Sequence, residues 1–168
     1  ISGGNSTFNG GAEFSSNSAA INGGGIYIGG ATTFSAGSNT TFILKSNSAG
    51  TMGSTEEYAY TNGLGGAIYS GSSSTVSFGS LSIDGESAYI GNWGAFYIST
   101  GSVNINGTLN VTNNMTSCGG GLYITTGNLM VSNTATFTNN RARDHGGAVY
   151  VMSTGVVTFN SGATFTNN

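Results

Sequence analysis

A short glycine-tyrosine signature recurs five times along this chain and divides it into repeats. Each copy places an aliphatic or phenyl residue between a small residue and a tyrosine, as in Gly66-Ala67-Ile68-Tyr69. The tyrosines follow one another at spacings of 42, 28, 26 and 27 residues, at Tyr27, Tyr69, Tyr97, Tyr123 and Tyr150. A fixed period of about 20 to 50 residues is typical of repeat architectures, so the signature predicts a solenoid.

Two further columns of apolar residues recur with the same period, and each has period-two spacing typical of a half-buried strand. The first column is Phe8, Phe34, Phe78, Ile105, Val131 and Phe159, and the second is Phe14, Phe42, Ile83, Val111, Phe137 and Phe165. The signature itself supplies a third strand, with Ile26, Ile68, Phe96, Leu122 and Val149 facing inward. We therefore predict an all-β fold: a right-handed parallel β-helix of about six coils of roughly 27 residues, with three short strands per coil.

The bends of each coil carry their own repeated residues. Glycine pairs precede the third strand and are expected where positive φ or close packing excludes a Cβ, with Trp93 as a local departure. Asparagine follows the second strand and is expected to hydrogen-bond to its copy in the next coil. Its positions are Asn17, Asn114, Asn140 and Asn168, with Lys45 and Glu86 in the remaining coils.

The repeat pattern covers residues 1–168, which we interpret as one β-solenoid segment of a longer chain. One insertion interrupts it, an inserted loop at residues 49–62 of the second coil that holds Glu56, Glu57, Tyr58 and Tyr60. Insertions in solenoids form loops on one face, which is often the binding face, although a long surface loop is also tolerated at little entropic cost.

Composition excludes several classes of function. Only 5% of the 168 residues are charged and the net charge is −3, so Lys45, Arg141 and Arg143 make too few cations to bind nucleic acid. No apolar run approaches the roughly 20 residues of a transmembrane segment. Cys118 is the only cysteine, so neither a disulfide nor a paired zinc site is expected within one copy, and we predict no metal and no cofactor.

The motifs resemble the repeats of the chlamydial polymorphic outer membrane proteins. The resemblance rests on Gly-Gly-Ala-aliphatic segments such as Gly146-Gly147-Ala148-Val149, and on Phe-x-x-Asn segments such as Phe137-Thr138-Asn139-Asn140. In that family the repeats form the passenger of an autotransporter, a surface-exposed rod that acts as an adhesin. The resemblance thus implies an extracellular or cell-surface location, and similar repeats also occur in secreted eukaryotic proteins.

The five tyrosines of the signature are the candidate binding or assembly face: Tyr27, Tyr69, Tyr97, Tyr123 and Tyr150. Alternation around the inward aliphatic column turns each ring outward beside a glycine or alanine, which is expected to leave the rings accessible. Such rings could pack on sugars, on proteins or on another copy of the chain. Alternatively, stacking of like on like only stabilises the sheet.

Outward threonines and serines form further columns, including Thr7, Thr33, Ser77 and Thr158, and Thr41, Ser82, Thr136 and Thr164. Flat threonine arrays resemble ice-binding solenoids, but Asn104 and Met130 interrupt the first column, and the β-propensity of threonine explains the pattern equally well. In a secreted eukaryotic protein, five sequons are possible glycosylation sites: Asn5, Asn39, Asn106, Asn110 and Asn114.

We expect no catalytic residues and therefore no enzyme activity. Asp84 and Glu86 share a strand end, and the segment from Arg141 to His145 is interpreted as a solvated charged turn. The sequence favours a non-enzymatic extracellular β-solenoid that presents repetitive ladders for adhesion, with cell-surface glycans, proteins or other copies as partners. A structural subunit of an extracellular filament is the alternative, and an ice-binding protein ranks third.

Overall fold

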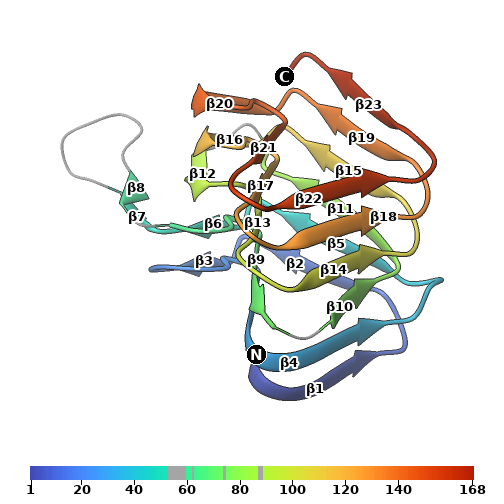
Figure 1. Ribbon diagram of the computed structural model, residues 1–168. Coiled ribbons are helices and arrows are strands. Elements are labelled where there is room, and N and C mark those ends of the chain that lie inside the picture. The colour runs from blue at the N-terminus through green and yellow to red at the C-terminus, as the bar shows by residue number, and fades with distance from the viewer. Residues whose placement is uncertain (53–59, 62, 74, 87–88) are drawn as a thin grey trace.

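The computed structural model describes residues 1–52, 60, 61, 63–73, 75–86 and 89–168, and these form a parallel β-solenoid (Figure 1). Successive coils lie on top of one another, from the N-terminus at the bottom of the view to the C-terminus at the top. None of the described residues is helical, so this part of the chain offers no helical membrane span.

Two faces of the solenoid each hold six stacked parallel strands. The first face consists of β1 (Ser2–Phe8), β4 (Ile26–Ala36), β10 (Thr75–Phe78), β14 (Ser102–Ile105), β18 (Asn128–Val131) and β22 (Val156–Phe159). The second face consists of β2 (Ala12–Ser15), β5 (Thr41–Lys45), β11 (Ser80–Asp84), β15 (Leu109–Thr112), β19 (Ala135–Thr138) and β23 (Ala163–Thr166).

The third face carries the glycine-tyrosine signature. Its strands are the start of β4, then β9 (Ile68–Ser72), β13 (Phe96–Ile98), β17 (Leu122–Ile124) and β21 (Val149–Val151). Because β4 runs without a break from the third face onto the first, the two faces are joined into one ten-stranded sheet. Six levels on two faces and five on the third correspond to about five turns, where about six coils were predicted, and the predicted all-β solenoid of stacked parallel strands is confirmed (Figure 1).

A flank of additional short strands was not predicted from the sequence. It comprises β3 (Ser18–Ala19), β6 (Ser48–Ala49), β12 (Tyr89–Trp93), β16 (Met115–Cys118) and β20 (Arg141–His145). The segment from Arg141 to His145 is thus a strand paired with β16, and the expected charged turn was wrong. At the predicted insertion, β7 (Thr51–Met52) pairs antiparallel with β8 (Tyr60–Thr61), whereas Glu56, Glu57 and Tyr58 lie outside the described residues.

The core is filled by the inward columns of the three faces. Phenylalanines dominate it, and Phe42 lies edge-on against both Phe34 and Phe78, at centroid distances of 5.8 and 5.4 Å. Edge-to-face pairs of this kind add stabilisation beyond the buried area. Charged side chains are absent from this core among the described residues, which agrees with the high cost of burying an unpaired charge.

The second coil is shifted by two residues from the predicted alignment. Phe34 pairs with Ser6 and Val76, and Ala36 takes the position expected for Phe34, between Phe8 and Phe78. The reason is the register of the third face: Tyr27 pairs with Tyr69, and Ala36 and Phe78 each follow their tyrosine by nine residues. The turn at Gly37–Thr40, closed by Thr40 N–H donating to Gly37 O at 3.0 Å, contains the extra residues that precede the second strand. A shift of two keeps the same faces inward, so the core survives it.

The glycine bends behave as predicted. The first glycine of each bend has a φ between 60° and 65°, at Gly23, Gly65, Gly94, Gly119 and Gly146. The second glycine lies against backbone: a Cβ on Gly120 would sit 2.1 Å from the carbonyl oxygen of Gly147. Trp93 does not occupy a glycine position, because that bend is one residue shorter and Gly94 takes the positive φ.

The asparagine ladder also forms, with one change of member. The Nδ2 of each asparagine donates to the Oδ1 of its copy in the next coil, from Asn114 to Asn140 at 2.9 Å and from Asn140 to Asn168 at 2.8 Å. The second coil contributes Asn47 rather than Lys45, because of the two-residue shift, and Asn17 donates to it at 2.9 Å. Asn140 is fully buried and also donates to Val111 O at 2.9 Å.

We predict that Asn140→Ala destabilises the protein by about 2 to 4 kcal/mol, because it removes these bonds and leaves buried backbone and amide groups of neighbouring coils unpaired. Urea unfolding measures the change. Asn133→Ala is the matched control, since Asn133 is exposed and should change stability by less than about 0.5 kcal/mol. Equal stabilities of the two variants would contradict the role of the ladder.

Candidate functional site

The five tyrosines form a continuous stack along the third face. Tyr27 lies over Tyr69 with ring centroids 5.0 Å apart and planes inclined by 5°, and Tyr69 lies over Tyr97 at 5.5 Å and 9°. Tyr97 and Tyr123 are 5.2 Å apart at 17°, whereas Tyr150 is tilted by 57° against Tyr123. The parallel register of the strands places like rings over one another, as the stacking interpretation requires.

The expectation that all five rings are accessible was wrong. Tyr97 and Tyr123 are only 6% and 5% exposed, Tyr69 and Tyr150 are half-buried, and Tyr27 is 39% exposed. The cause is the flank that the sequence did not predict: Trp93, at the end of β12, stacks on Tyr123 at 5.7 Å and on Tyr97 at 6.4 Å. The indole covers the two central rings, so the column presents little of its central surface to a partner.

Burial changes the acid chemistry of these two phenols. It raises the pKa of Tyr123 to about 12, with a smaller contribution from neighbouring Tyr97, and it raises the pKa of Tyr97 as well. The Tyr123 hydroxyl donates to Met152 Sδ at 2.6 Å. Both phenols are therefore neutral at physiological pH and act as packing and hydrogen-bonding groups.

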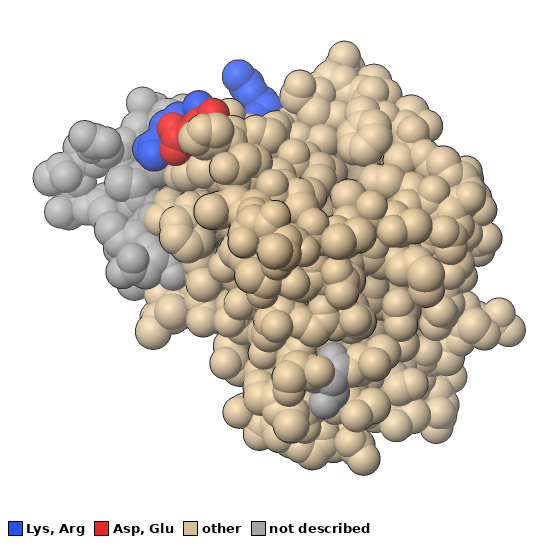
Figure 2. Space-filling view, viewed as in Figure 1, with Lys and Arg blue, Asp and Glu red and all other residues tan. Residues whose placement is uncertain are grey.

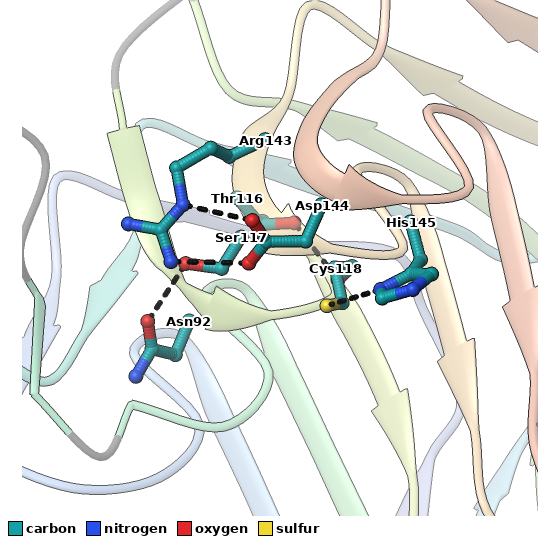
Figure 3. Close-up of polar contacts among 7 residues, drawn as sticks. All are labelled: Asn92, Thr116, Ser117, Cys118, Arg143, Asp144 and His145. Atoms are coloured by element: carbon teal, nitrogen blue, oxygen red, sulfur yellow. Dashed lines mark hydrogen bonds and ion pairs between the residues drawn. The ribbon is translucent and has the colours of Figure 1, made fainter.

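Cys118 and His145 meet on the flank, where β16 and β20 lie side by side (Figure 3). The Cys118 Sγ is 3.6 Å from His145 Nδ1, a distance that suits a weak S–H···N hydrogen bond. Burial raises the pKa of the Cys118 thiol, and the nearby charge of Asp144 raises it further. A raised pKa keeps the sulfur protonated near neutral pH, so the pair lacks the thiolate that nucleophilic chemistry needs.

Two charged groups of this region, Arg143 and Asp144, are paired at the surface. Figure 2 shows basic and acidic side chains gathered at the upper left, near the position of β20 in Figure 1, while the rest of the described surface in that view is uncharged. Arg143 Nη2 lies 3.0 Å from Asp144 Oδ2, and the guanidinium lowers the pKa of Asp144 (Figure 3). Both side chains are largely solvent-exposed, so the pair contributes little to stability.

Two further carboxylates, those of Asp84 and Glu86, accept hydrogen bonds at the bend of the third coil. Asp84 Oδ1 accepts hydrogen bonds from the Glu86 N–H at 2.9 Å and from Asn113 Nδ2 at 3.1 Å, and the Glu86 carboxylate accepts one from Ser46 Oγ. Among the described residues, no three His, Cys, Asp or Glu side chains come together as a possible metal site.

A surface groove lies where the second-face bends meet the flank, and sequence reasoning missed it. It has a volume of about 580 Å³ and is lined by side chains from three successive coils, among them Asn113, Met115, Asn139, Arg141 and Asn167. Asn113, Asn139 and Asn167 all adopt a φ near 55°. The signal that could have found the groove is the first asparagine of Asn113-Asn114, Asn139-Asn140 and Asn167-Asn168, because the ladder uses only the second of each pair.

Four of the five candidate glycosylation sites are exposed, namely Asn5, Asn39, Asn106 and Asn110. Asn114 is not: its side chain is 1% exposed and its amide belongs to the buried ladder. A glycan on Asn114 would need that amide outside the bend, so this member of the predicted set was wrong.

The outward hydroxyl columns are less regular than the sequence suggested. Thr7 pairs with Ser35 and Thr33 with Asn5, while Thr41 pairs with Ser80. The shift of the second coil thus separates residues that the sequence alignment placed in one row. From the third coil upward the rows are in register, as in Ser82, Asn110, Thr136 and Thr164.

We predict that ionisation of Tyr123 destabilises the fold at high pH. The folded protein holds its pKa near 12, above the ordinary value of about 10, so the neutral form is favoured on folding. The stabilisation is complete below pH 10 and is lost as the pH rises from 10 to 12. Urea unfolding across this range should give a shallower decline for Tyr123→Phe than for the parent protein. Tyr27→Phe, in the same column, is the control, and identical slopes for Tyr123→Phe and parent would contradict the prediction.

Comparison with known proteins identifies the repeat. Residues 134–152 match the family model of the Chlamydia polymorphic membrane protein repeat, while no curated protein and no solved structure matches the chain. The matched segment contains Phe137-Thr138-Asn139-Asn140, which ends in the buried ladder residue, and Gly146-Gly147-Ala148-Val149, which forms the bend into β21. The chain therefore carries a repeat of the Chlamydia polymorphic membrane protein type on a β-solenoid scaffold.

Proposed function

We propose that this β-solenoid is a non-enzymatic adhesive rod that makes many weak contacts with glycans or proteins of a cell surface. The match to the polymorphic membrane protein repeat implies a surface or outer-membrane protein, and a solenoid is typical of non-enzymatic surface proteins. Adhesion is the further step, and it rests on the arrangement of the exposed side chains.

The observation that carries the proposal is the repetition of outward polar groups in register. On the second face, Ser82, Asn110, Thr136 and Thr164 follow one another in successive coils, and a neighbouring row holds Thr112, Thr138 and Thr166. Parallel pairing repeats each row every 4.8 Å or so along the rod. Many equivalent weak contacts on one rigid body give avidity without a deep pocket.

The role of the tyrosine column is narrower in this proposal than the sequence suggested. Tyr97 and Tyr123 stabilise the third face by stacking, since Trp93 covers both rings. Contact with a partner falls to the polar rows of the other faces.

A structural subunit of an extracellular filament remains the second candidate. It is favoured by the low charge of the chain, since only 5% of its residues are charged and equivalent faces can meet with little repulsion.

A bead-attachment assay tests the adhesive function. Fluorescent beads coated with the folded protein should attach to cultured epithelial cells in numbers at least ten-fold above beads coated with the urea-unfolded protein or with serum albumin. Because attachment depends on avidity, the soluble monomer should compete only at concentrations about 100-fold above that of the protein on the beads. Equal attachment of folded and unfolded coatings would contradict adhesion by the rod, and growth of the soluble protein into filaments would favour the second candidate.

A further inference from the structure

A smaller pocket lies at the bend that leads from the flank to the third face. It has a volume of about 290 Å³ and is lined by three apolar side chains and two amides: Ile21, Leu64, Trp93, Asn22 and Asn92. Asn22, Leu64 and Trp93 belong to three successive coils and are joined by parallel backbone bridges, with Leu64 in the middle. The pocket is therefore bounded within the stack, by the coil of Asn22 on one side and by the coil of Trp93 on the other.

The indole of Trp93 forms the upper wall of the pocket. Its plane is inclined by only 16° to the ring of Tyr123 and by 22° to that of Tyr97. Because the tyrosine rings stack face to face along the column, one indole face is turned along the solenoid toward the coil of Leu64, the side on which the pocket lies. Trp93 is 39% exposed, and no described residue accepts a hydrogen bond from its Nε1. Stacking thus fixes the indole and leaves it with a free face and a free donor.

The opposite side of the pocket holds an amide without a partner. Asn22 Oδ1 is buried and receives no hydrogen bond from any described residue, and its Nδ2 donates none to them. A buried carbonyl oxygen without a donor is destabilising and is uncommon in native structures. Since no hydrogen bond holds this amide, rotation about its Cβ–Cγ bond turns its oxygen toward the pocket at little cost.

Asn92 supplies a second donor in a fixed position. Its Oδ1 accepts a hydrogen bond from Ser117 Oγ at 2.9 Å, which orients the amide. Figure 3 shows its Nδ2 turned away from Ser117, and no described residue accepts a hydrogen bond from that nitrogen. The pocket therefore offers two unused donors, Asn92 Nδ2 and Trp93 Nε1, together with the unused acceptor of Asn22.

The height of the pocket suits one flat ring. The backbones of Asn22 and Trp93 are two strand spacings apart, about 9.6 Å. A ring in van der Waals contact on both of its faces takes about 7 to 8 Å of that height. The ring can therefore lie over Leu64, with one face against the indole and its edge within reach of the amides.

From these groups we propose that the pocket binds a single neutral pyranose ring of a cell-surface glycan. The C–H face of the sugar packs on the Trp93 indole, while its hydroxyls donate to Asn22 Oδ1 and accept from Asn92 Nδ2. A charged sugar is less suited, because no lining residue carries a charge to pair with it. A purely apolar ligand is also less suited, because it leaves the Asn22 oxygen without a donor.

This inference rests on the proposed adhesive function, and it names the glycan chemistry that one part of the rod recognises. The pocket is separate from the polar rows of the second face. Sugar binding can therefore be measured independently of bead attachment.

Fluorescence titration tests the proposal, because Trp93 is the only tryptophan of the chain and its emission reports on the pocket alone. The probes are the methyl glycosides of galactose, glucose and mannose, and N-acetylglucosamine. At least one should shift the emission, with a Kd of about 1 to 10 mM. Asn22→Ala should weaken that binding at least five-fold and still fold, since the side chain makes no hydrogen bond with a described residue. Asn133→Ala, exposed and outside the pocket, is the matched control and should bind like the parent protein.

Three results would overturn the proposal: no shift with any of the four sugars, equal affinity of Asn22→Ala and parent, or tighter binding of N-acetyl-leucinamide than of every sugar. The last result would assign the pocket to an apolar peptide side chain. The bead assay separates the two levels. If parent beads attach but no sugar binds, the pocket proposal fails while adhesion stands. If a sugar binds but parent beads do not attach, the adhesive function fails while the pocket stands as a sugar site.

Discussion

Parallel backbone hydrogen bonding between successive coils is the interaction on which the rest of this structure depends. Each strand of the three faces pairs with its counterpart one coil above or below, so a residue in one coil lies directly over its equivalent in the next. The spacing of about 4.8 Å brings equivalent side chains into contact. A residue type is therefore retained at a position only if copies of it stack favourably, and asparagine, tyrosine and phenylalanine all do so here.

The same constraint explains why the chain has so few charges. Identical charged residues in register would repel one another at this short distance. The described pairs avoid it: Lys45 is in register with Asp84 and Ser15, Arg141 with Met115, and Glu13 with Ile43. A charge thus occurs where the residue in register with it is of another kind. The few charged side chains of this surface therefore lie at positions where the repeat changes residue type, while the uncharged polar rows follow the repeat.

The period, the three inward columns and the glycine bends could be predicted from the sequence because each is a local pattern that the backbone geometry requires. The shift of the second coil was missed because two phenylalanines, Phe34 and Phe42, match the phenylalanine columns by residue type, although the pairing of Tyr27 with Tyr69 places Ala36 and Leu44 in those columns. The same register places Asn47 rather than Lys45 in the ladder.

Less of the candidate site than of the fold could be predicted from the sequence. The flank strands are two to five residues long and lack apolar alternation, so the cover that Trp93 places over Tyr97 and Tyr123 was not foreseen. For the same reason the groove was missed, because it joins side chains from three coils that only the stacking brings together. Asn114 is buried because it belongs to the ladder. The Asn-x-Ser/Thr pattern of a glycosylation site does not indicate whether the asparagine is buried.

Nuclear Overhauser contacts between coils test the stacking most directly. The account predicts cross-strand contacts with parallel geometry between Val76, Val103 and Leu129, and between Leu109 and Ala135, residues that are 26 to 27 positions apart in the sequence. Contacts of antiparallel hairpins between neighbouring strands within a coil, in place of these, would contradict it.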